Sequence, residues 1–325
     1  MSPFNSIHLL AALVSSAAVP FVSAHSFVTN INIEGRSYQG FRPMPGSQNP
    51  ALLTAWSTTA SDQGYVNQTS YQGPDIICHR GAANGHGHAP VKAGGQIHVQ
   101  WNGWPQNHRG PVLDYLADCG KSGCETVDKT QLQFFKISQA GLVKPASKQR
   151  DYSGEPSFGS WASDQLIANN NSWVVEIPPR IKPGFYVLRT EIIALHNATY
   201  SDGAQNYPQC FNIEIQGSGD EVPAGTPGES LYKASDPGVQ LNITTGVQNY
   251  PIPGPTLISD AVTASLNHPV PTASGTPITV EELVRKTPAP RDGGIAMATG
   301  AAVANNAKRH PRHMDRRWYH QGQGY

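Results

Sequence analysis

The first histidine after an apolar N-terminal stretch has the most distinctive chemistry in this sequence. Residues 23–31 read SAHSFVTNI, and cleavage after Ala24 makes His25 the first residue of the mature chain. A terminal histidine offers two metal-binding nitrogens, its free amine and its ring. With one further imidazole they form a planar three-nitrogen set that suits copper. The sequence therefore suggests a copper site that depends on signal cleavage.

The third nitrogen has to come from another histidine. The candidates that lie among the β-type segments are His79, His86, His88, His98, His108 and His196. His108 is favoured because Trp104 and Pro105 form a rigid approach to it and Gly110 and Pro111 a sharp exit. A side chain fixed between such elements is suited to act as a preorganised ligand.

The other histidines have simpler explanations. His86 and His88 lie in a glycine-rich loop, NGHGH, without an anchored third ligand. His98 falls on the polar side of the segment QIHVQW and is expected to be exposed, whereas His79 follows Cys78 and is expected to lie near a disulfide.

A second group of polar residues lies near the end of the β-type region. The segment 203–211 reads GAQNYPQCF, and Gln205 and Tyr207 share one face if it is extended. His196 follows the long apolar run 185–195. Taken singly, each of these residues is equally well explained by an ordinary structural role.

The elements that would position these residues are short strands. Turn residues such as Gly and Pro separate β-type runs at 26–33, 96–101, 132–137, 173–177, 185–195 and 210–215. Only 164–170 suggests a helical turn. Many short strands with long loops predict an all-β fold, an antiparallel sandwich or barrel over residues 25 to about 250.

Composition narrows the class of protein. Lys and Arg number 23 and Asp and Glu number 23, so no basic footprint for nucleic acid is present. Residues 1–24 resemble a secretory signal, and no later apolar run is long enough to span a membrane. We therefore expect a secreted, soluble protein with no nucleic-acid or membrane partner.

The four cysteines are expected to form disulfides in an oxidising compartment. Three pairings are possible. The short spacing of Cys119 and Cys124 favours a bridge between them, which leaves Cys78 with Cys210. A zinc site is the alternative for the C-x4-C spacing, but no CxxC pair is present to complete it.

From about residue 251 the composition shifts to Pro, Ala, Thr, Ser and Gly. We expect a largely disordered tail over 255–325, with a basic end and a possible short helix at 278–286. Secretion also makes the N-x-S/T sequons candidate glycosylation sites; these are at Asn67, Asn170, Asn197 and Asn242.

Taken together, several long motifs resemble the fungal lytic polysaccharide monooxygenases of auxiliary activity family 9, formerly glycoside hydrolase family 61. The similarity begins at His25 and runs to about Gly254. The matching segments are 71–78 (YQGPDIIC), 101–119 (WNGWPQNHRGPVLDYLADC), 126–137 (TVDKTQLQFFKI), 169–175 (NNNSWVV), 185–196 (FYVLRTEIIALH) and 203–211 (GAQNYPQCF).

The resemblance implies a fold and a metal site. It implies an immunoglobulin-like β-sandwich over residues 25–254 that binds one copper ion. His25 and His108 would supply the nitrogens and Tyr207 the axial position, while His196 and Gln205 would hydrogen-bond the bound oxygen species. It also implies the pairs Cys78–Cys210 and Cys119–Cys124.

The resemblance further implies the reaction and its partners. Family members act as monomers on cellulose or a related β-1,4-glucan, at C1 or C4, with an electron donor and O2 or H2O2. The sequence departs from the family pattern at Ser26, Arg109, Thr190 and Thr244. Because Thr244 replaces a common surface tyrosine, Tyr38 and Tyr232 are the remaining candidates for stacking on sugar.

Two other functions would fit a similar sandwich. A hydrolase of the same substrates requires two paired carboxylates, and the candidates are Asp75, Asp114, Asp118, Glu176 and Glu191. None lies in an evident acid/base arrangement, and Glu191 is expected to be a structural partner within its strand. The second alternative is a non-catalytic copper- or carbohydrate-binding protein, which would leave its ligand uncleaved.

Overall fold

The computed structural model describes residues 26–46, 48–147 and 158–261. The expected signal segment 1–24, His25 and the tail from residue 262 onward lie outside the described residues, as does the expected helix at 278–286. Every structural statement below concerns the described ranges.

One sheet has four strands in the order β10-β5-β1-β2, all antiparallel to their neighbours. Its strands are β1 (Val28–Ile33), β2 (Arg36–Gln39), β5 (Gln96–Trp101) and β10 (Ser172–Glu176).

The larger sheet has the order β13-β7-β6-β11-β12-β3. Its strands are β3 (Val66–Asn67), β6 (Val112–Asp118), β7 (Gln133–Ala140), β11 (Gly184–Ala194), β12 (Gln205–Gln216) and β13 (Thr226–Pro227). A further strand, β4 (Ala89–Lys92), pairs with β12 in parallel, which departs from an entirely antiparallel arrangement.

Several smaller elements complete the fold. A two-stranded ribbon consists of β8 (Leu142–Lys144) and β9 (Ser160–Trp161). The helices are α1 (Asp75–Cys78) and α2 (Ala162–Ala168). Single 3-10 turns occur at Pro50–Leu52, Gln68–Ser70, Lys129–Gln131, Gly228–Ser230 and Ile243–Thr245.

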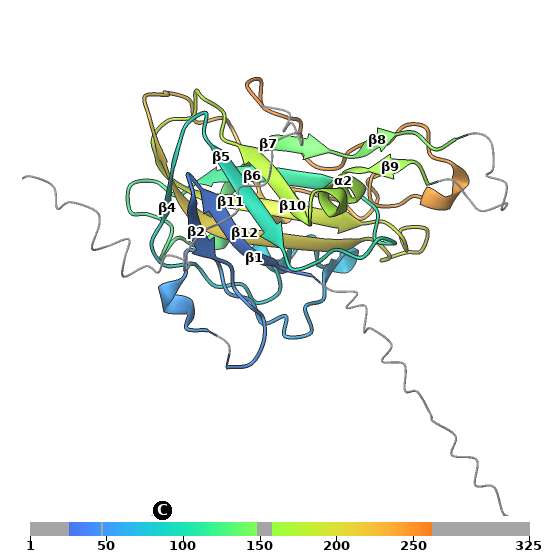
Figure 1. The fold of residues 1–325 in the computed structure, drawn as a ribbon, viewed down its shortest axis with the longest axis horizontal. Coiled ribbons are helices and arrows are strands. Elements are labelled where there is room, and N and C mark those ends of the chain that lie inside the picture. The colour runs from blue at the N-terminus through green and yellow to red at the C-terminus, as the bar shows by residue number, and fades with distance from the viewer. Residues whose placement is uncertain (1–25, 47, 148–157, 262–325) are drawn as a thin grey trace, which may run out of the picture. The chain divides into compact units, whose positions relative to one another are not determined.

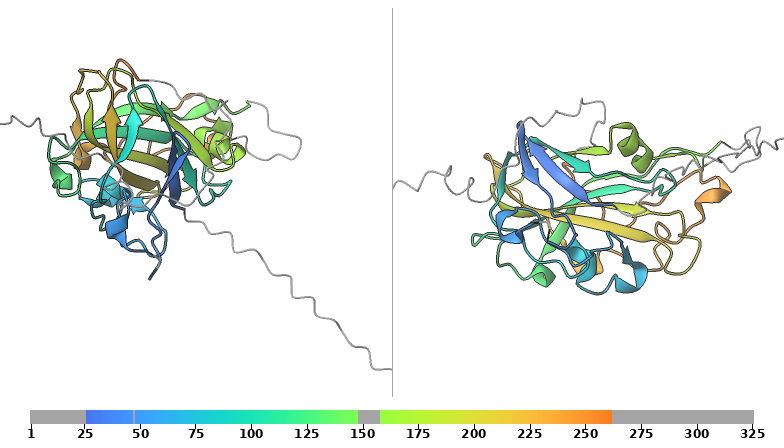
Figure 2. Two further views of the ribbon diagram at one scale, coloured as in Figure 1. Left: turned by 60° about the vertical axis from the view of Figure 1, so that its left-hand side comes forward. Right: turned by 60° about the horizontal axis from the view of Figure 1, so that its bottom comes forward.

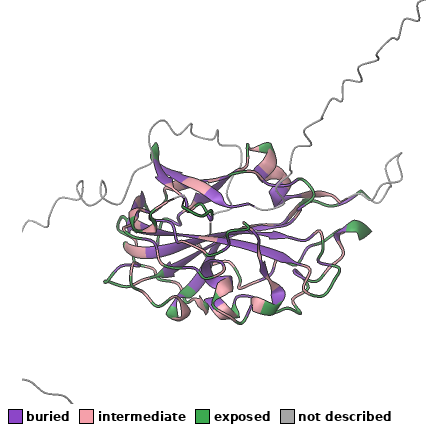
Figure 3. Ribbon diagram, turned by 90° about the horizontal axis from the view of Figure 1, so that it is seen from below, coloured by how far each residue is buried: buried purple, intermediate pink, exposed green. Residues whose placement is uncertain are grey.

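Alternating side chains of the two sheets form the main core. Val99 and Trp173 from the smaller sheet pack in one cluster with Ile192, Tyr207 and Phe211 from the larger one. Their burial from water is the main force that holds the layers together. Strands are buried along most of their length, and the exposed residues concentrate in the loops (Figure 3).

A second core lies on the other face of the larger sheet. There, Val187, Ile193 and Cys210 pack with Ile77 of α1 and Tyr232 from a distant loop. The blue and cyan loop segments between β2 and β4 lie along this side of strand β12 (Figures 1 and 2). The larger sheet is therefore buried on both faces, by a second sheet on one side and by loops on the other.

The expected β-sandwich is confirmed. Each predicted β-type run overlaps a strand, and the helical turn expected at 164–170 overlaps α2. Strand β6 was missed because Asp114 and Tyr115 interrupt its apolar pattern, yet both are fully buried. Strand β4 was missed because it is short and contains Pro90.

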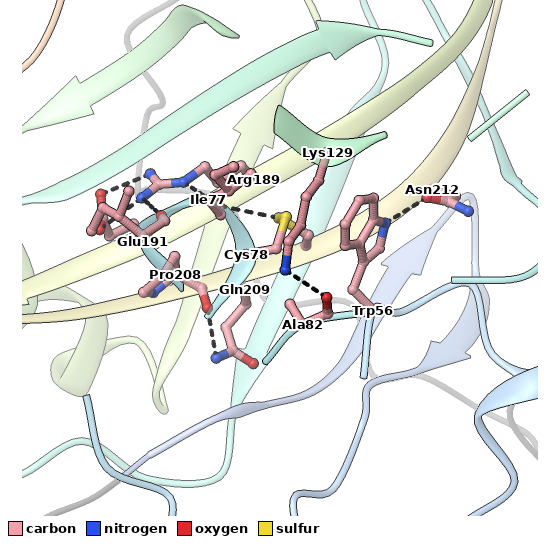
Figure 4. The surroundings of a disulfide bond; sticks show 12 residues. Trp56, Ile77, Cys78, Ala82, Lys129, Arg189, Glu191, Pro208, Gln209 and Asn212 are labelled. Carbon is pink, nitrogen blue, oxygen red and sulfur yellow. Dashed lines mark hydrogen bonds and ion pairs between the residues drawn. A yellow bond between two sulfur atoms is a disulfide. The ribbon is translucent and has the colours of Figure 1, made fainter. Parts of the chain in front are cut away.

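Both disulfides pair as expected. Cys78 joins Cys210 at a Cα separation of 5.4 Å, and Cys119 joins Cys124 at 5.2 Å. The first bridge ties α1 to the centre of β12, next to a buried ion pair (Figure 4).

The packed chain continues slightly beyond Gly254. Leu257 forms a parallel bridge with Lys136 of β7, and the Ile258 amide donates to the Lys136 carbonyl at 3.1 Å. The boundary expected at residue 254 is thus a few residues early. Within the described ranges, no helix has the length and apolar character needed to cross a bilayer.

Candidate functional site

The hairpin formed by β11 and β12 carries three of the candidate residues. Ala194 at the end of β11 pairs with Gln205 at the start of β12, and Ile192 pairs with Tyr207. His196 lies two residues beyond β11. The antiparallel register therefore brings His196 close to Gln205 across the base of a single loop.

Gln205 and Tyr207 point to the same face of β12, as their spacing predicted. The Tyr207 hydroxyl donates to Gln205 Oε1 at 3.0 Å, and both side chains are buried. Burial raises the pKa of Tyr207 above its ordinary value, so the side chain is a neutral phenol at physiological pH.

His108 is held by the loop that follows β5. Trp104 Nε1 donates to the His108 carbonyl at 2.7 Å, and His108 Nδ1 lies 2.8 Å from Asn107 Oδ1. Because an amide oxygen only accepts, Nδ1 carries the proton in this contact. That tautomer leaves the lone pair a metal needs on Nε2.

Ring contacts bring these two segments together. The His108 and His196 rings lie 3.9 Å apart between centroids at an angle of 32°. Trp104 meets Tyr207 edge to face at 5.0 Å. His196 Nδ1 is buried without a hydrogen-bond partner in the part of the chain that the structure describes. Desolvation lowers the pKa of His196, so its neutral form is favoured.

The first described residue of the chain is anchored to the loop that carries His108. Ser26 Oγ donates to Asn102 Oδ1 at 2.7 Å, and the Phe27 amide donates to the same oxygen at 3.0 Å. Asn102 belongs to the loop that carries His108. The described residues alone contain no group of three His, Cys, Asp or Glu able to hold a metal. A site here requires a further donor, and His25 directly precedes the anchored Ser26.

The histidines of the glycine-rich loop do not join the cluster. His86 is exposed. His88 Nε2 accepts from the Cys124 amide at 2.9 Å, and its Nδ1 lies 3.4 Å from Glu125 Oε1. His88 therefore supports the loop closed by the Cys119–Cys124 bridge.

His79 and His98 are both structural, and one of them differs from expectation. His79 lies beside the Cys78 disulfide, as expected, and burial lowers its pKa to about 4. His98 was expected to be exposed but is buried, because β5 lies between β1 and β10 with Asn32 and Val174 as neighbours.

The buried carboxylates do not form a hydrolytic pair. Glu191 makes an ion pair with Arg189 on the loop-covered face of the larger sheet, which confirms its expected structural role. Asp114 accepts from Trp173 Nε1 at 3.2 Å on the opposite face, between the two sheets. The sheet itself separates the two groups.

The proposed sugar-stacking roles of Tyr38 and Tyr232 are wrong. Tyr38 is 1% exposed in the core between the sheets, and Tyr232 is 2% exposed with its hydroxyl donating to Glu191. Neither ring can reach a polysaccharide. An exposed aromatic that sequence reasoning missed is Tyr200, in the β11–β12 loop; its only signal was its position among polar turn residues.

The four sequons differ in their surroundings. Asn170 and Asn197 are exposed. The Asn67 amide donates to Asp202 Oδ2 at 2.9 Å, and Asn242 Oδ1 accepts from the Thr244 amide at 2.8 Å. Glycosylation at any of them stays a prediction.

Comparison with known proteins identifies the family. The model of Auxiliary Activity family 9 (formerly GH61) matches residues 25–250. The AA9 family lytic polysaccharide monooxygenase A of Thermoascus aurantiacus is 53% identical over 235 residues, which are 72% of this chain and 99% of that protein. The chain is a member of auxiliary activity family 9.

Other members agree in sequence and structure. The AA9 family lytic polysaccharide monooxygenase D of Podospora anserina is 45% identical over 305 residues, 93% of this chain and 83% of that protein. The extended catalytic domain of Hypocrea jecorina LPMO9A matches with a TM-score of 0.70 at 48% identity, covering 78% of this chain and all of that one. Family membership makes the chain a monooxygenase, an oxidoreductase of the polysaccharide-degrading kind.

Proposed function

We propose that this family member is a secreted, monomeric, copper-dependent monooxygenase that cleaves β-1,4-glucan chains such as cellulose, at C1 or C4. It would use an external electron donor together with O2 or H2O2. The observation that supports the proposal most is that the His108 ring packs on His196 and the neighbouring Trp104 on Tyr207, while Ser26 is bonded to the same loop.

The donor set fits copper. The amine and ring of His25 and Nε2 of His108 would supply nitrogen donors, and the Tyr207 hydroxyl an oxygen donor. Bound copper would supply the one-electron chemistry that lets O2 or H2O2 oxidise a glucan C–H bond. Signal removal belongs to this proposal, because an uncleaved peptide would convert the His25 amine into a poorly binding amide.

The chain's own residues would prepare the site. Asn107 holds the His108 ring in the tautomer with Nε2 deprotonated, and Trp104 fixes the His108 backbone. The buried neutral phenol of Tyr207 would restrict access to the metal from the core side. His196 and Gln205 would hydrogen-bond the oxygen co-substrate.

The test replaces His108 with alanine and compares it with His86→Ala, which removes an exposed histidine from the metal-like loop. We expect His108→Ala to weaken copper binding by about a hundredfold or more and to abolish reductant-dependent oxidation of cellulose. His86→Ala should change neither. Calorimetry with copper alone and mass spectrometry of products from cellulose and xyloglucan would measure both effects.

Each result separates the competing functions. Oxidised ends that require copper and reductant support the monooxygenase, and their position identifies C1 or C4 attack. Unoxidised reducing oligosaccharides would indicate a hydrolase, and binding without new chain ends a non-catalytic protein. Retained oxidation by His108→Ala, or a secreted chain whose mass places its first residue elsewhere than His25, would contradict the proposed site.

A further inference from the structure

The loop between β11 and β12 exposes a single tyrosine next to the candidate site. His196 lies at one base of this loop and Gln205 at the other. Tyr200 lies midway between them in the sequence, with 70% of its surface exposed. The other exposed large apolar side chains among the described residues are Met44, Val143 and Val222, at 43–46%. No other described aromatic belongs to this exposed set.

The loop that carries Tyr200 is closed by its own backbone. The Tyr200 amide donates to the Asn197 carbonyl at 3.0 Å, and the Gly203 amide donates to the Tyr200 carbonyl at 3.1 Å. A Cβ on Gly203 would lie 1.8 Å from the Asn197 carbonyl oxygen, so only glycine allows this close approach.

Contacts outside the loop hold it in place. Asp202 accepts from the Asn67 side chain and from the Thr69 amide, both at 2.9 Å. Within the loop, Ala198 and Ala204 are fully buried in the second core. The tyrosine is thus presented on a fixed base, and its exposure is a property of an ordered turn.

We infer that Tyr200 stacks on a pyranose ring of the polysaccharide while the neighbouring site acts on another part of the same chain. An exposed aromatic face suits the apolar C–H face of a sugar. A polymeric substrate must extend from His196 and Gln205 across the adjoining surface, where this loop lies. The inference rests on the proposed function, because it assigns a contact to that enzyme's substrate.

A glycan attached to the loop could also supply a sugar ring for Tyr200 to stack on. Asn197, Ala198 and Thr199 form a sequon, and the turn joins Asn197 to Tyr200. A glycan on Asn197 would also offer a pyranose ring. We assign the contact to substrate because the tyrosine lies between two residues of the candidate site, and the experiment separates the two sources.

The experiment measures binding without oxidation. Tyr200→Ala, Tyr200→Trp and the control Val222→Ala are each prepared with Asn197 intact and with Asn197→Gln. Val222 is exposed but follows the opposite end of β12. Binding to amorphous cellulose and to a soluble cello-oligosaccharide is measured with the mature copper-loaded protein in the absence of reductant.

We expect Tyr200→Ala to raise the dissociation constant about three- to tenfold in both backgrounds. Tyr200→Trp should retain the wild-type affinity or improve it, and Val222→Ala should leave it unchanged. Thermal unfolding should be nearly the same for all of them, since the side chains removed are exposed.

Two results would overturn the inference. Unchanged binding by Tyr200→Ala in both backgrounds would show that the ring makes no substrate contact. A loss confined to protein with Asn197 intact would assign the ring to the glycan. Wild-type oxidised products are assayed separately with reductant, so failure of the stacking contact and failure of the proposed reaction give different results.

Discussion

On one face of the β11–β12 hairpin, Gln205 and Tyr207 point toward the smaller sheet, whereas on the other face Glu191 and Asn206 point into the loop layer. Residues 205, 206 and 207 alternate between the two faces along β12. The same short stretch of strand therefore contributes to both the candidate site and a buried polar network. We call the face with Gln205 and Tyr207 the site face and the face with Glu191 and Asn206 the network face.

On the network face, both oxygens of the Glu191 carboxylate are hydrogen-bonded. Glu191 accepts from Arg189 Nη1 at 2.8 Å, from Asn206 at 2.8 Å and from the Tyr232 hydroxyl. Arg189 Nε donates to the Ile77 carbonyl at 2.8 Å, beside the Cys78–Cys210 bridge (Figure 4). Buried ion pairs persist only when such additional hydrogen bonds satisfy them.

The site face differs because one of its polar groups has no partner within the described residues. His196 Nδ1 is buried without a hydrogen bond, whereas both Glu191 oxygens are occupied. The contrast is between a face whose carboxylate is satisfied by its own hydrogen bonds and a face that carries the candidate copper-site residues. Changes on the network face should reduce stability, and changes on the site face should reduce copper binding.

The largest loss of stability should come from Glu191→Gln, a substitution on the network face. The substitution leaves the Arg189 guanidinium fully buried without its counter-charge, at 0% exposure. We expect the free energy of unfolding to fall by about 3–5 kcal/mol. Urea denaturation of the copper-free protein would measure the loss.

A matched control is Glu176→Gln at the partly exposed end of β10. Its effect should stay within about 0.5 kcal/mol. If the two substitutions were equally harmless, the ion pair would contribute nothing to the scaffold and the contrast between the faces would fail.

Local patterns were enough to predict much of this fold. The strands containing Val99, Trp173 and Phe211 were predicted from short apolar runs between turn residues, because such runs fit a pleated, half-buried surface. The structural role of Glu191 also followed, because a charge in a strand between apolar neighbours requires a partner.

Burial by distant segments could not be predicted from the same patterns. Tyr232 lies in a polar stretch, yet its hydroxyl reaches Glu191, 41 residues earlier in the chain. His98 is flanked by two neighbouring strands, and Asp114 lies between the two sheets. Likewise, the His108–His196 contact joins segments 88 residues apart, so its geometry depended on the complete fold.

A smaller change in the free energy of unfolding, which depends on pH, is expected for Asp114→Asn. Burial between the sheets raises the pKa of Asp114 to about 7, although the hydrogen bond from Trp173 opposes this shift. The folded protein thus keeps a proton that the unfolded chain releases near pH 4. Stability due to Asp114 is present at low pH and is lost as the pH rises toward 7.

The variant should therefore gain about 2–4 kcal/mol over wild type as the pH rises from about 4 to 7. Urea denaturation across this range would measure the difference. His79, whose pKa is lowered to about 4, makes both proteins more stable as the pH rises, so its effect cancels. A difference that shrinks with rising pH would show that Asp114 is ionised in its buried position.

The smallest expected effect comes from a pair of Tyr→Phe substitutions, one on each face. Tyr207→Phe removes the donor to Gln205 on the site face, and Tyr71→Phe removes the 2.7 Å hydrogen bond to Asn206 on the network face. Each should reduce the free energy of unfolding by about 0.5–1.5 kcal/mol, since each removes one buried hydrogen bond. Only Tyr207→Phe should alter the electron paramagnetic resonance spectrum of the Cu(II)-loaded protein. A spectrum changed equally by Tyr71→Phe would mean that the network extends its influence through Asn206 to the metal, and the two faces of β12 would then act as one unit.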